Sequence, residues 1–278
     1  MRKLRFFGHG EAFYDVYWIC FRREKSLSLA LDGEKTEWGG IFRLREPFTD
    51  EGHSLSIYTR KPIRGRTRIV VDGKAILRLD IEPAQCPDPP AFTEAPPNAP
   101  VPFPTDVEGA LDGIILCDYG KGAISHKDLM QAAKARAAGT DVFVNTKRPR
   151  DFSLMWDISA REANLVAIQP TAVIASDRDC SITELSTAFP NSFWIYTCGK
   201  SGIIYGRRKI IRGAFSPEAD DVANTIGAGD YFTAHFAMLY TLERDFSSAA
   251  RAAAQRTVKH LQGRVRCSTD EVTHGFHG

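Results

Sequence analysis

Residues 224–230 read NTIGAGD and place a carboxylate directly after two closely spaced glycines. Apolar side chains follow at positions 232, 236, 239 and 240, which is the spacing of one face of a helix. The backbone amides of Gly227, Ala228 and Gly229 are therefore expected at a helix N-terminus, where they form a site for an anion. Asp230 then stands in the first turn of that helix.

Two interpretations of Asp230 fit this spacing. In one, the carboxylate only caps the helix, as acidic residues in first turns often do. In the other, the amides stabilise charge on a phosphoryl group in transfer, and Asp230 accepts the proton of the attacking hydroxyl. Short glycine motifs are weak signals, and the spacing alone favours neither interpretation.

The elements around this motif alternate between strand and helix after residue 104. Strands are predicted over 113–120, 141–147, 164–170 and 192–199, and a helix over 126–139, closed by Gly139. The alternation predicts a mainly parallel sheet with helices on both faces. Ligands of such sheets bind at the carboxyl ends of strands, where the polar turns 118–119, 145–147 and 197–199 fall.

The N-terminal part has a β-rich pattern. Residues 67–82 predict a hairpin with its turn at Asp72-Gly73, and we expect a small β lid built from about 10–31 and 55–82. Residues 83–104 carry nine of the fifteen prolines and predict an irregular connection. We expect one domain over residues 1–278, and a homodimer that covers the open edges of strands 67–82.

Composition excludes several classes of protein. A net charge of +2 does not indicate nucleic acid as a partner, and no apolar run approaches the roughly 18 residues of a membrane span. The six cysteines lack paired spacing, so neither a disulfide framework nor a zinc site is expected, and Cys117 is predicted to be a buried thiol. These features predict a soluble cytoplasmic protein.

The motif NTIGAGD resembles the D-T-x-G-A-G-D signature of the ribokinase-like (PfkB) carbohydrate kinase family. Further segments resemble its heptose-phosphate kinase branch: DYGKG at 118–122, VFVNTK at 142–147, KAILRLDIE at 74–82, FYDVYW at 13–18 and WGG at 38–40. The resemblance implies a three-layer α/β sandwich with a β lid. It also implies ATP and Mg²⁺ as cofactors, and phosphate transfer to a hydroxyl of a sugar, sugar phosphate or nucleoside.

The resemblance also assigns roles to residues. Asp230 matches the catalytic base, and Gly227, Ala228 and Gly229 match the anion hole. Nucleotide contacts are expected from Asn224, Thr225, Lys147, Thr197, Gly199 and Gly202, and acceptor contacts from Asp15, Gly39, Gly40, Asp118 and Lys121. Lys147 and Lys121 are equally well interpreted as surface lysines at strand ends.

The chain departs from the family pattern at several positions. Asn224 replaces the first aspartate of the signature, and the asparagine expected after Gly40 is absent. Our alignment places Thr171 and Ile174 where relatives have N-x-x-E, whose carboxylate helps to organise Mg²⁺, so the metal ligands stay unassigned. These departures leave a second hypothesis open, a catalytically weak relative that binds a nucleotide or sugar as a regulatory module.

Overall fold

A computed structural model describes residues 2–22, 29–60, 64–71, 74–79, 93–95, 111–218 and 227–273. Its strands are β1 (Arg5–Gly10), β2 (Ala12–Arg22), β3 (Leu29–Gly40), β4 (Ser54–Arg60), β5 (Arg64–Val71), β6 (Lys74–Leu79), β7 (Thr93–Ala95), β8 (Gly113–Asp118), β9 (Asp141–Thr146), β10 (Ala172–Ser176), β11 (Phe193–Thr197), β12 (Ile203–Arg207) and β13 (Ile210–Phe215). Its helices are α1 (Arg45–Asp50), α2 (His126–Ala137), α3 (Pro149–Glu162), α4 (Ile182–Ala188), α5 (Ala228–Glu243) and α6 (Phe246–Thr273), with short 3-10 helices η1 (Ile41–Leu44) and η2 (Gly199–Ser201).

The larger sheet has the strand order β13-β12-β11-β10-β9-β8-β1-β4-β7 among the described residues. All neighbours from β11 to β7 pair in parallel, and near the other edge β12 pairs antiparallel with both β11 and β13. Every residue of β8 is buried, as expected for a central parallel strand with both faces covered. The carboxyl ends of β8 to β11 therefore meet along one edge of the sheet.

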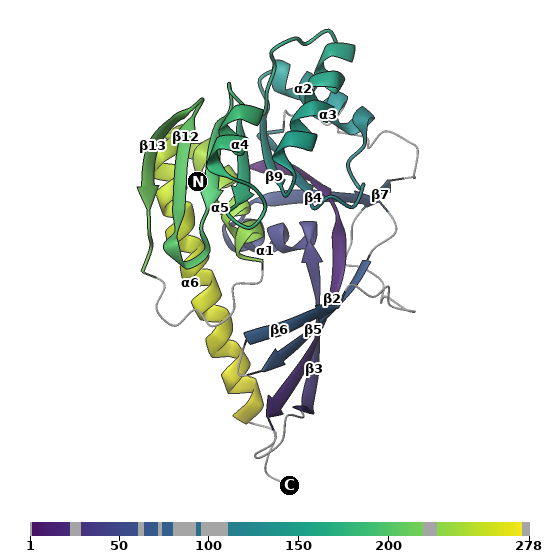
Figure 1. Ribbon diagram of the computed structural model, residues 1–278, viewed down its shortest axis with the longest axis vertical. Coiled ribbons are helices and arrows are strands. Elements are labelled where there is room, and N and C mark those ends of the chain that lie inside the picture. The colour runs from purple at the N-terminus through teal and green to yellow at the C-terminus, as the bar shows by residue number, and fades with distance from the viewer. Residues whose placement is uncertain are drawn as a thin grey trace.

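Helices cover both faces of this sheet and produce three layers (Figure 1). One core packs side chains of α2, α3 and α4, such as Leu129, Trp156 and Leu185, against the sheet. The other core packs α1, α5 and α6 on the opposite face, with Phe48 and Phe236 among its members. The expected α/β sandwich with a mainly parallel sheet is confirmed.

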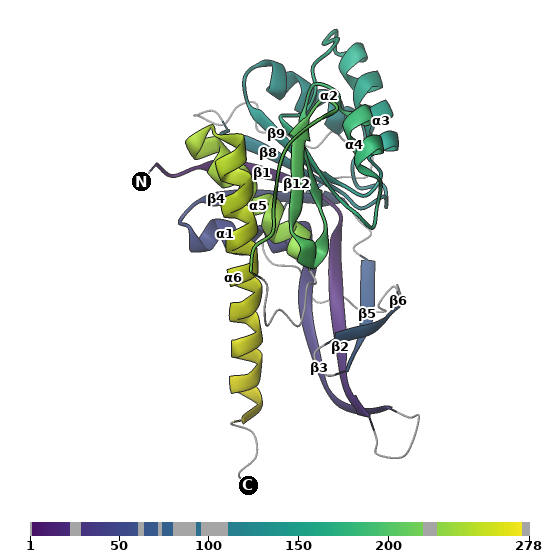
Figure 2. The ribbon, with the colours of Figure 1, turned by 60° about the vertical axis from the view of Figure 1, so that its left-hand side comes forward.

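A smaller sheet has the order β3-β2-β5-β6 and stands apart from the larger sheet, at the end toward which α6 runs (Figure 2). Its strands β5 and β6 pair antiparallel, as the hairpin prediction for 67–82 requires, although residues 72–73 lie outside the described ranges. One boundary of the expected lid is wrong. Residues 55–60 belong to β4, which pairs in parallel with β1 in the larger sheet.

The strand predicted over 164–170 is also wrong. These residues form turns after α3, with Asn164 at φ 57° and Ala167 at φ 70°, and Val166 is 76% exposed. The amide of Leu165 donates to the carbonyl of Ala160, which turns the chain back instead of extending it. The strand of this region is β10, and it begins only at residue 172.

Other predictions in the second half agree with the structure. The helix predicted over 126–139 is α2, which Ser125 and Asp128 start with a capping box. Cys117 is fully buried and forms no disulfide with a described cysteine. In the Pro-rich segment 83–104, only 93–95 are described, and they form the edge strand β7. No helix in the described ranges combines the length and apolar character needed to cross a membrane.

Candidate functional site

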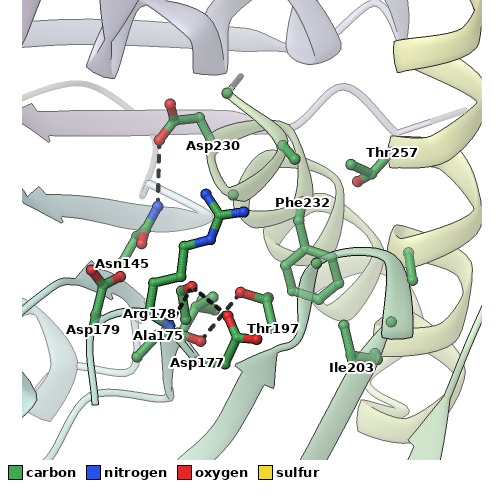
Figure 3. A pocket seen from close by; sticks show the side chains of 18 of the residues that line it. Asn145, Ala175, Asp177, Arg178, Asp179, Thr197, Ile203, Asp230, Phe232 and Thr257 are labelled. Atoms are coloured by element: carbon green, nitrogen blue, oxygen red, sulfur yellow. Dashed lines mark hydrogen bonds between the residues drawn. The ribbon is translucent and has the colours of Figure 1, made fainter. Parts of the chain in front are cut away.

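A cavity of about 500 Å³ opens at the carboxyl ends of β9, β10 and β11. Its opposite wall is the N-terminal end of α5, and residues of α6 close one side (Figure 3). This is the position at which ligands bind in open parallel sheets, and the volume suits a small molecule. The cavity is therefore the candidate site.

Asp230 lies in this cavity in the first turn of α5. The helix starts at Ala228 after Gly227, which caps it with φ 82°, a conformation that glycine adopts without strain. The amides of Asp230 and Tyr231 donate to the carbonyl of Gly227 at 2.9 and 3.0 Å. Asp230 is only 6% exposed, so its carboxylate is held near the positive end of the helix dipole.

Two side chains from neighbouring strand ends hold this carboxylate. The hydroxyl of Tyr119, after β8, donates to Oδ1 of Asp230. The side-chain amide of Asn145, on β9, lies 3.4 Å from the same oxygen (Figure 3). Hydrogen bonds to an ionised carboxylate stabilise the charged form, which is the form that accepts a proton.

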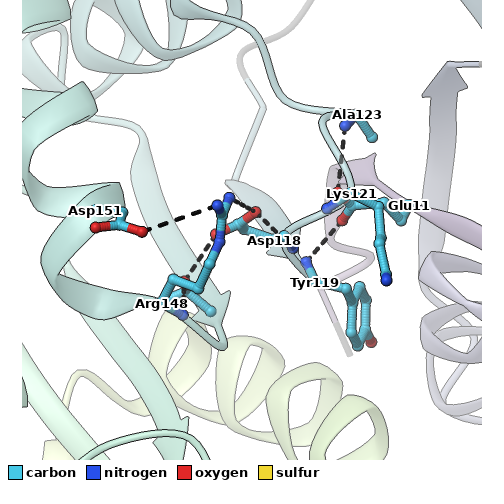
Figure 4. Close-up of polar contacts among 9 residues, drawn as sticks. Glu11, Asp118, Tyr119, Lys121, Ala123, Arg148 and Asp151 are labelled. Atoms are coloured by element: carbon cyan, nitrogen blue, oxygen red, sulfur yellow. Dashed lines mark hydrogen bonds and ion pairs between the residues drawn. The ribbon is translucent and has the colours of Figure 1, made fainter.

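The turn that carries Tyr119 is itself fixed by two buried carboxylates (Figure 4). Glu11 accepts hydrogen bonds from the amides of Tyr119, Lys121 and Ala123 at 2.7, 2.9 and 3.2 Å. Asp118 accepts from the amide of Gly120 at 3.0 Å. The Tyr119 side chain is thus presented by a backbone that these two carboxylates hold in place.

Asp118 also ties this turn to the next one. Its carboxylate accepts from the Thr146 hydroxyl at 2.9 Å and from the Arg148 guanidinium at 3.4 Å, and it is 3% exposed. Burial raises the pKa of the neighbouring Cys117 thiol well above its usual value. The charges of Asp230, Glu11 and Asp118 raise that pKa further, in that order. Because Asp118 binds groups of both turns, it supports the site from behind. It is not among the described residues that line the cavity.

The loop after β10 brings both signs of charge into the cavity. The Ser176 hydroxyl donates to Asp177 at 3.1 Å and accepts from the amide of Arg178 at 3.2 Å. The backbone carbonyl of Ser176 accepts from the amide of Asp179 at 3.0 Å. Burial raises the pKa of the Asp179 carboxyl, which Lys147 lowers and Asp177 raises. Asp177, Arg178 and Asp179 all line the cavity.

This loop corrects the alignment of the metal motif. Thr171 precedes β10, is 6% exposed, and donates to Asp141 at 3.1 Å at the end of the sheet where β9 begins. Ile174 lies inside the strand and pairs with Asn145 and Ile195. Residues 177–180 follow the strand, so the comparison of Thr171 and Ile174 with the metal motif was wrong, and the acidic residues at this strand end are Asp177 and Asp179.

Basic side chains lie at both sides of the α5 N-terminus. Lys147 lines the cavity with its ammonium 5.6 Å from the centre of the Tyr119 ring. Arg43 is 5% exposed and packs so closely on Gly227 that a Cβ at that glycine would lie 2.6 Å from Nη1 of the arginine. This end of the cavity favours anionic groups.

The turn after β11 supplies the remaining wall. Thr197, Gly199 and Gly202, for which nucleotide contacts were predicted, line the cavity. Gly202 has φ 89°, and a Cβ there would lie 2.1 Å from the carbonyl oxygen of Phe215. Only glycine therefore permits this turn to pack against the strand end.

The structure places the remaining predicted residues as follows. Gly40 lines the cavity with φ 64°, whereas Gly39 pairs with Phe13 inside the smaller sheet. Asp15 lies on β2, opposite Glu37 of β3 and Arg66 of β5. The side chain of Lys121 is exposed and is not among the described lining residues, which agrees with a surface lysine. Asn224 and Thr225 lie outside the described ranges.

Several residues of the site were not assigned from the sequence. Tyr119 and Asn145 fall in polar turns at strand ends, so a signal for them existed. Arg178 was not assigned because we predicted the strand before it at 164–170, whereas β10 ends at residue 176. Glu11 gave no signal, because its partners are more than 100 residues away in the chain.

Comparisons with known proteins agree with this architecture. No model of a protein family matches the chain. Two curated relatives, both called Bifunctional protein HldE, come from Aliivibrio salmonicida and Aliivibrio fischeri and are 24% and 23% identical over 223 residues. The matches cover 78% of this chain and 45% of each relative, so the chain spans about half the length of these relatives.

Solved structures show the fold. Arabidopsis thaliana ribokinase complexed with ribose and ATP is similar with a TM-score of 0.60 and 14% identity, over 94% of this chain and 99% of that chain. Schistosoma mansoni adenosine kinase, in complex with 2-fluoroadenosine, has a TM-score of 0.62 and 11% identity, over 92% and 94%. A mutant of phosphofructokinase-2 from Escherichia coli has a TM-score of 0.61 and 10% identity, over 96% and 100%.

The chain therefore has the ribokinase-like α/β fold. Its structural neighbours are kinases of the ribokinase (PfkB) type, and the HldE matches agree with the resemblance to the heptose-phosphate kinase branch.

Proposed function

We propose that this protein transfers the γ-phosphoryl group of ATP to a hydroxyl of a sugar, sugar phosphate or nucleoside. The observation that carries the proposal is the position of Asp230. Its carboxylate lies in a cavity at the N-terminus of α5 and is held there by Tyr119 and Asn145. A helix cap alone needs neither the cavity nor the two additional partners.

The chemistry assigned to these groups is an in-line displacement. Asp230 accepts the proton of the acceptor hydroxyl as its oxygen forms a bond to the γ-phosphorus. The bond from that phosphorus to the β,γ-bridging oxygen breaks, and the electron pair leaves on ADP. The amides at the start of α5 and the positive end of its dipole stabilise the charge on the transferring oxygens.

Mg²⁺ fits the donors that the loop after β10 provides. Asp177 and Asp179 offer carboxylate oxygens, the ligands that Mg²⁺ prefers, and it commonly uses one or two protein carboxylates together with phosphates and waters. Mg²⁺ held there would supply positive charge that neutralises the phosphate oxygens. We propose that these two aspartates hold the ion or its waters.

Two sets of lining residues suit different parts of the substrates. Apolar residues of β12, α5 and α6, namely Ile203, Phe232, Ala254, Val258 and Leu261, suit the base of the nucleotide, next to the turn with Thr197, Gly199 and Gly202. Gly40, the last residue of β3, and Arg43 also line the cavity, and we assign them to the acceptor. The Arg43 guanidinium there favours an acceptor with a phosphate or carboxylate group.

The proposal is tested by thermal-shift measurements with nucleotides, sugars, sugar phosphates and nucleosides, each with and without Mg²⁺. A ligand that binds only the folded state raises the melting temperature by mass action. Acceptors that stabilise the protein are then incubated with Mg·ATP, and ADP formation is measured. We expect transfer to at least one acceptor. Tight nucleotide binding with no transfer to any stabilising acceptor would favour the regulatory binding module instead.

We further propose a cytoplasmic homodimer that forms through the smaller sheet. Within the described ranges, β3 and β6 have a neighbouring strand on one side only, and open edges of this kind pair readily. Light scattering tests this proposal, and a monomer at high micromolar concentration would refute it.

A further inference from the structure

The loop after β10 carries an arginine between its two acidic residues. The Arg178 side chain is exposed and points into the cavity, toward the end of α5 that carries Asp230 (Figure 3). Within the described ranges, no hydrogen bond or ion pair holds its guanidinium. Its backbone is fixed, because its amide donates to the Ser176 hydroxyl at 3.2 Å and the flanking amide of Asp177 donates to Thr197 at 2.9 Å.

This orientation brings a further positive charge to a part of the cavity that already holds two basic side chains and one carboxylate, that of Asp230. The N-terminus of α5 carries the positive end of the helix dipole, and Lys147 and Arg43 line the same cavity. The single carboxylate of Asp230 does not balance Arg178, Lys147, Arg43 and the helix dipole together, so a further anion between them is stabilised. The arrangement therefore fits an anion contacted on one side by helix amides and on the other by Arg178.

The chemistry of the guanidinium narrows the choice of anion. Its planar fork of N–H donors binds two oxygens of a phosphate group at once, which a lysine ammonium does not do. Asp177 and Asp179 flank the arginine and repel a carboxylate or phosphate that has no accompanying cation. A phosphate that binds together with Mg²⁺ suits this loop, because the cation pairs with the aspartates and the phosphate with Arg178.

We infer that Arg178 is a catalytic residue that binds the oxygens of the γ-phosphoryl group and stabilises their charge during transfer. This inference rests on the proposed function, because it requires a nucleoside triphosphate in the cavity. Arg178 contacts the phosphoryl group from the side opposite the amides of Ala228 and Gly229, so both groups act on the charge that develops there. Asp230 remains the group that accepts the proton.

The test compares two nucleotides that differ in the γ-phosphate. Titration calorimetry with Mg²⁺ measures binding of ADP and of the non-hydrolysable ATP analogue with an imido group between its β- and γ-phosphorus atoms. Arg178→Gln should weaken binding of the analogue by about 10- to 100-fold, the range expected for a hydrogen bond to a charged group. The affinity for ADP should stay within about twofold of that of the parent. The affinity of Arg178→Lys for the analogue should lie between those of the parent and of Arg178→Gln.

Arg150→Gln is the matched control, since it removes the same charge from an exposed arginine that is not a described lining residue. It should leave both affinities unchanged. Equal effects of Arg178→Gln on ADP and on the analogue, or no effect on either, would overturn the inference while leaving the proposed kinase standing. A parent protein that binds neither nucleotide would overturn the inference and the proposed function together.

Discussion

The Tyr119 hydroxyl donates a hydrogen bond to Oδ1 of Asp230, and this contact joins the turn after β8 to the first turn of α5. The two residues are 111 positions apart, and Glu11 and Asp118 hold the turn that presents the tyrosine. The carboxylate at the helix N-terminus is therefore positioned by a network that reaches β1, β8 and β9.

Replacing Tyr119 by phenylalanine should lower kcat on the order of fivefold, the effect of about 1 kcal/mol for one lost hydrogen bond. The KM for the nucleotide should change little, because Tyr119 contacts the proton-accepting carboxylate of Asp230. Steady-state kinetics measures both constants. Tyr58→Phe is the control, since the Tyr58 ring packs on Phe7 in another part of the core. Unchanged kcat in Tyr119→Phe would show that the hydrogen bond does not position Asp230.

Asp179→Asn should raise the free Mg²⁺ concentration needed for half-maximal activity by roughly 10-fold or more, the usual effect of removing a carboxylate near a bound metal. The reason is that Asp177 and Asp179 line the cavity directly after β10, where we propose that Mg²⁺ binds. Activity is measured over a range of Mg²⁺ at fixed ATP. Asp151→Asn changes an exposed carboxylate near Arg148 and should have no such effect. An unchanged Mg²⁺ requirement in Asp179→Asn would exclude this residue from the metal site.

Gly227→Ala should destabilise the folded protein by about 1–3 kcal/mol, because a residue with a side chain is strained at φ 82°. The new methyl group would also collide with Arg43. Gly229→Ala is the comparison, since a Cβ there would have Asn145 at 4.0 Å as its nearest neighbour. Urea unfolding measures both variants. Equal stability of the two variants would contradict the described geometry of the helix start.

The stability of the fold should fall as pH drops from about 6.5 to about 4. His235 is buried on α5, and desolvation, Arg256 and His260 lower its pKa from 6.5 to about 4. Between these pH values His235 binds a proton in the unfolded chain and not in the folded chain. The free energy of unfolding therefore decreases by up to about 3 kcal/mol as the pH falls. Urea unfolding at pH 7.5 and pH 5 should show this loss. His235→Leu should reduce it, and an undiminished pH dependence in that variant would assign the effect to other groups.

Much of the fold follows from local patterns in the sequence. The helix α2 was predicted with its end at Gly139, and β8, β9 and β11 from short runs that end in polar turns. The run 164–170 misled us, because a short apolar segment after a helix has the same composition as a buried strand. Asn164 adopts positive φ and turns the chain there, so the true strand begins eight residues later.

The site was predictable where its residues share one motif or follow a predicted strand, as Thr197 and Gly199 do. Gly227 and Asp230 are neighbours in the chain, so their geometry follows from the start of one helix. The placement of Tyr119 depends on Glu11, and that of Arg178 on the position of β10, and neither is local information. The correction of β10 also shows that Thr171 and Ile174 were compared with the metal motif at the wrong place, because residues 177–180 are the ones that follow the strand.

The most direct test of the account compares the parent protein with Asp230→Asn, by measuring kcat for phosphate transfer and the Kd of Mg·ATP in the same preparations. Asparagine preserves the shape of the side chain and cannot accept the proton of the acceptor hydroxyl. We predict that kcat falls by at least about 10²-fold, a typical contribution of a general base, while the Kd stays within about threefold. An Asp230→Asn protein that turns over acceptor at the parent rate would contradict the account.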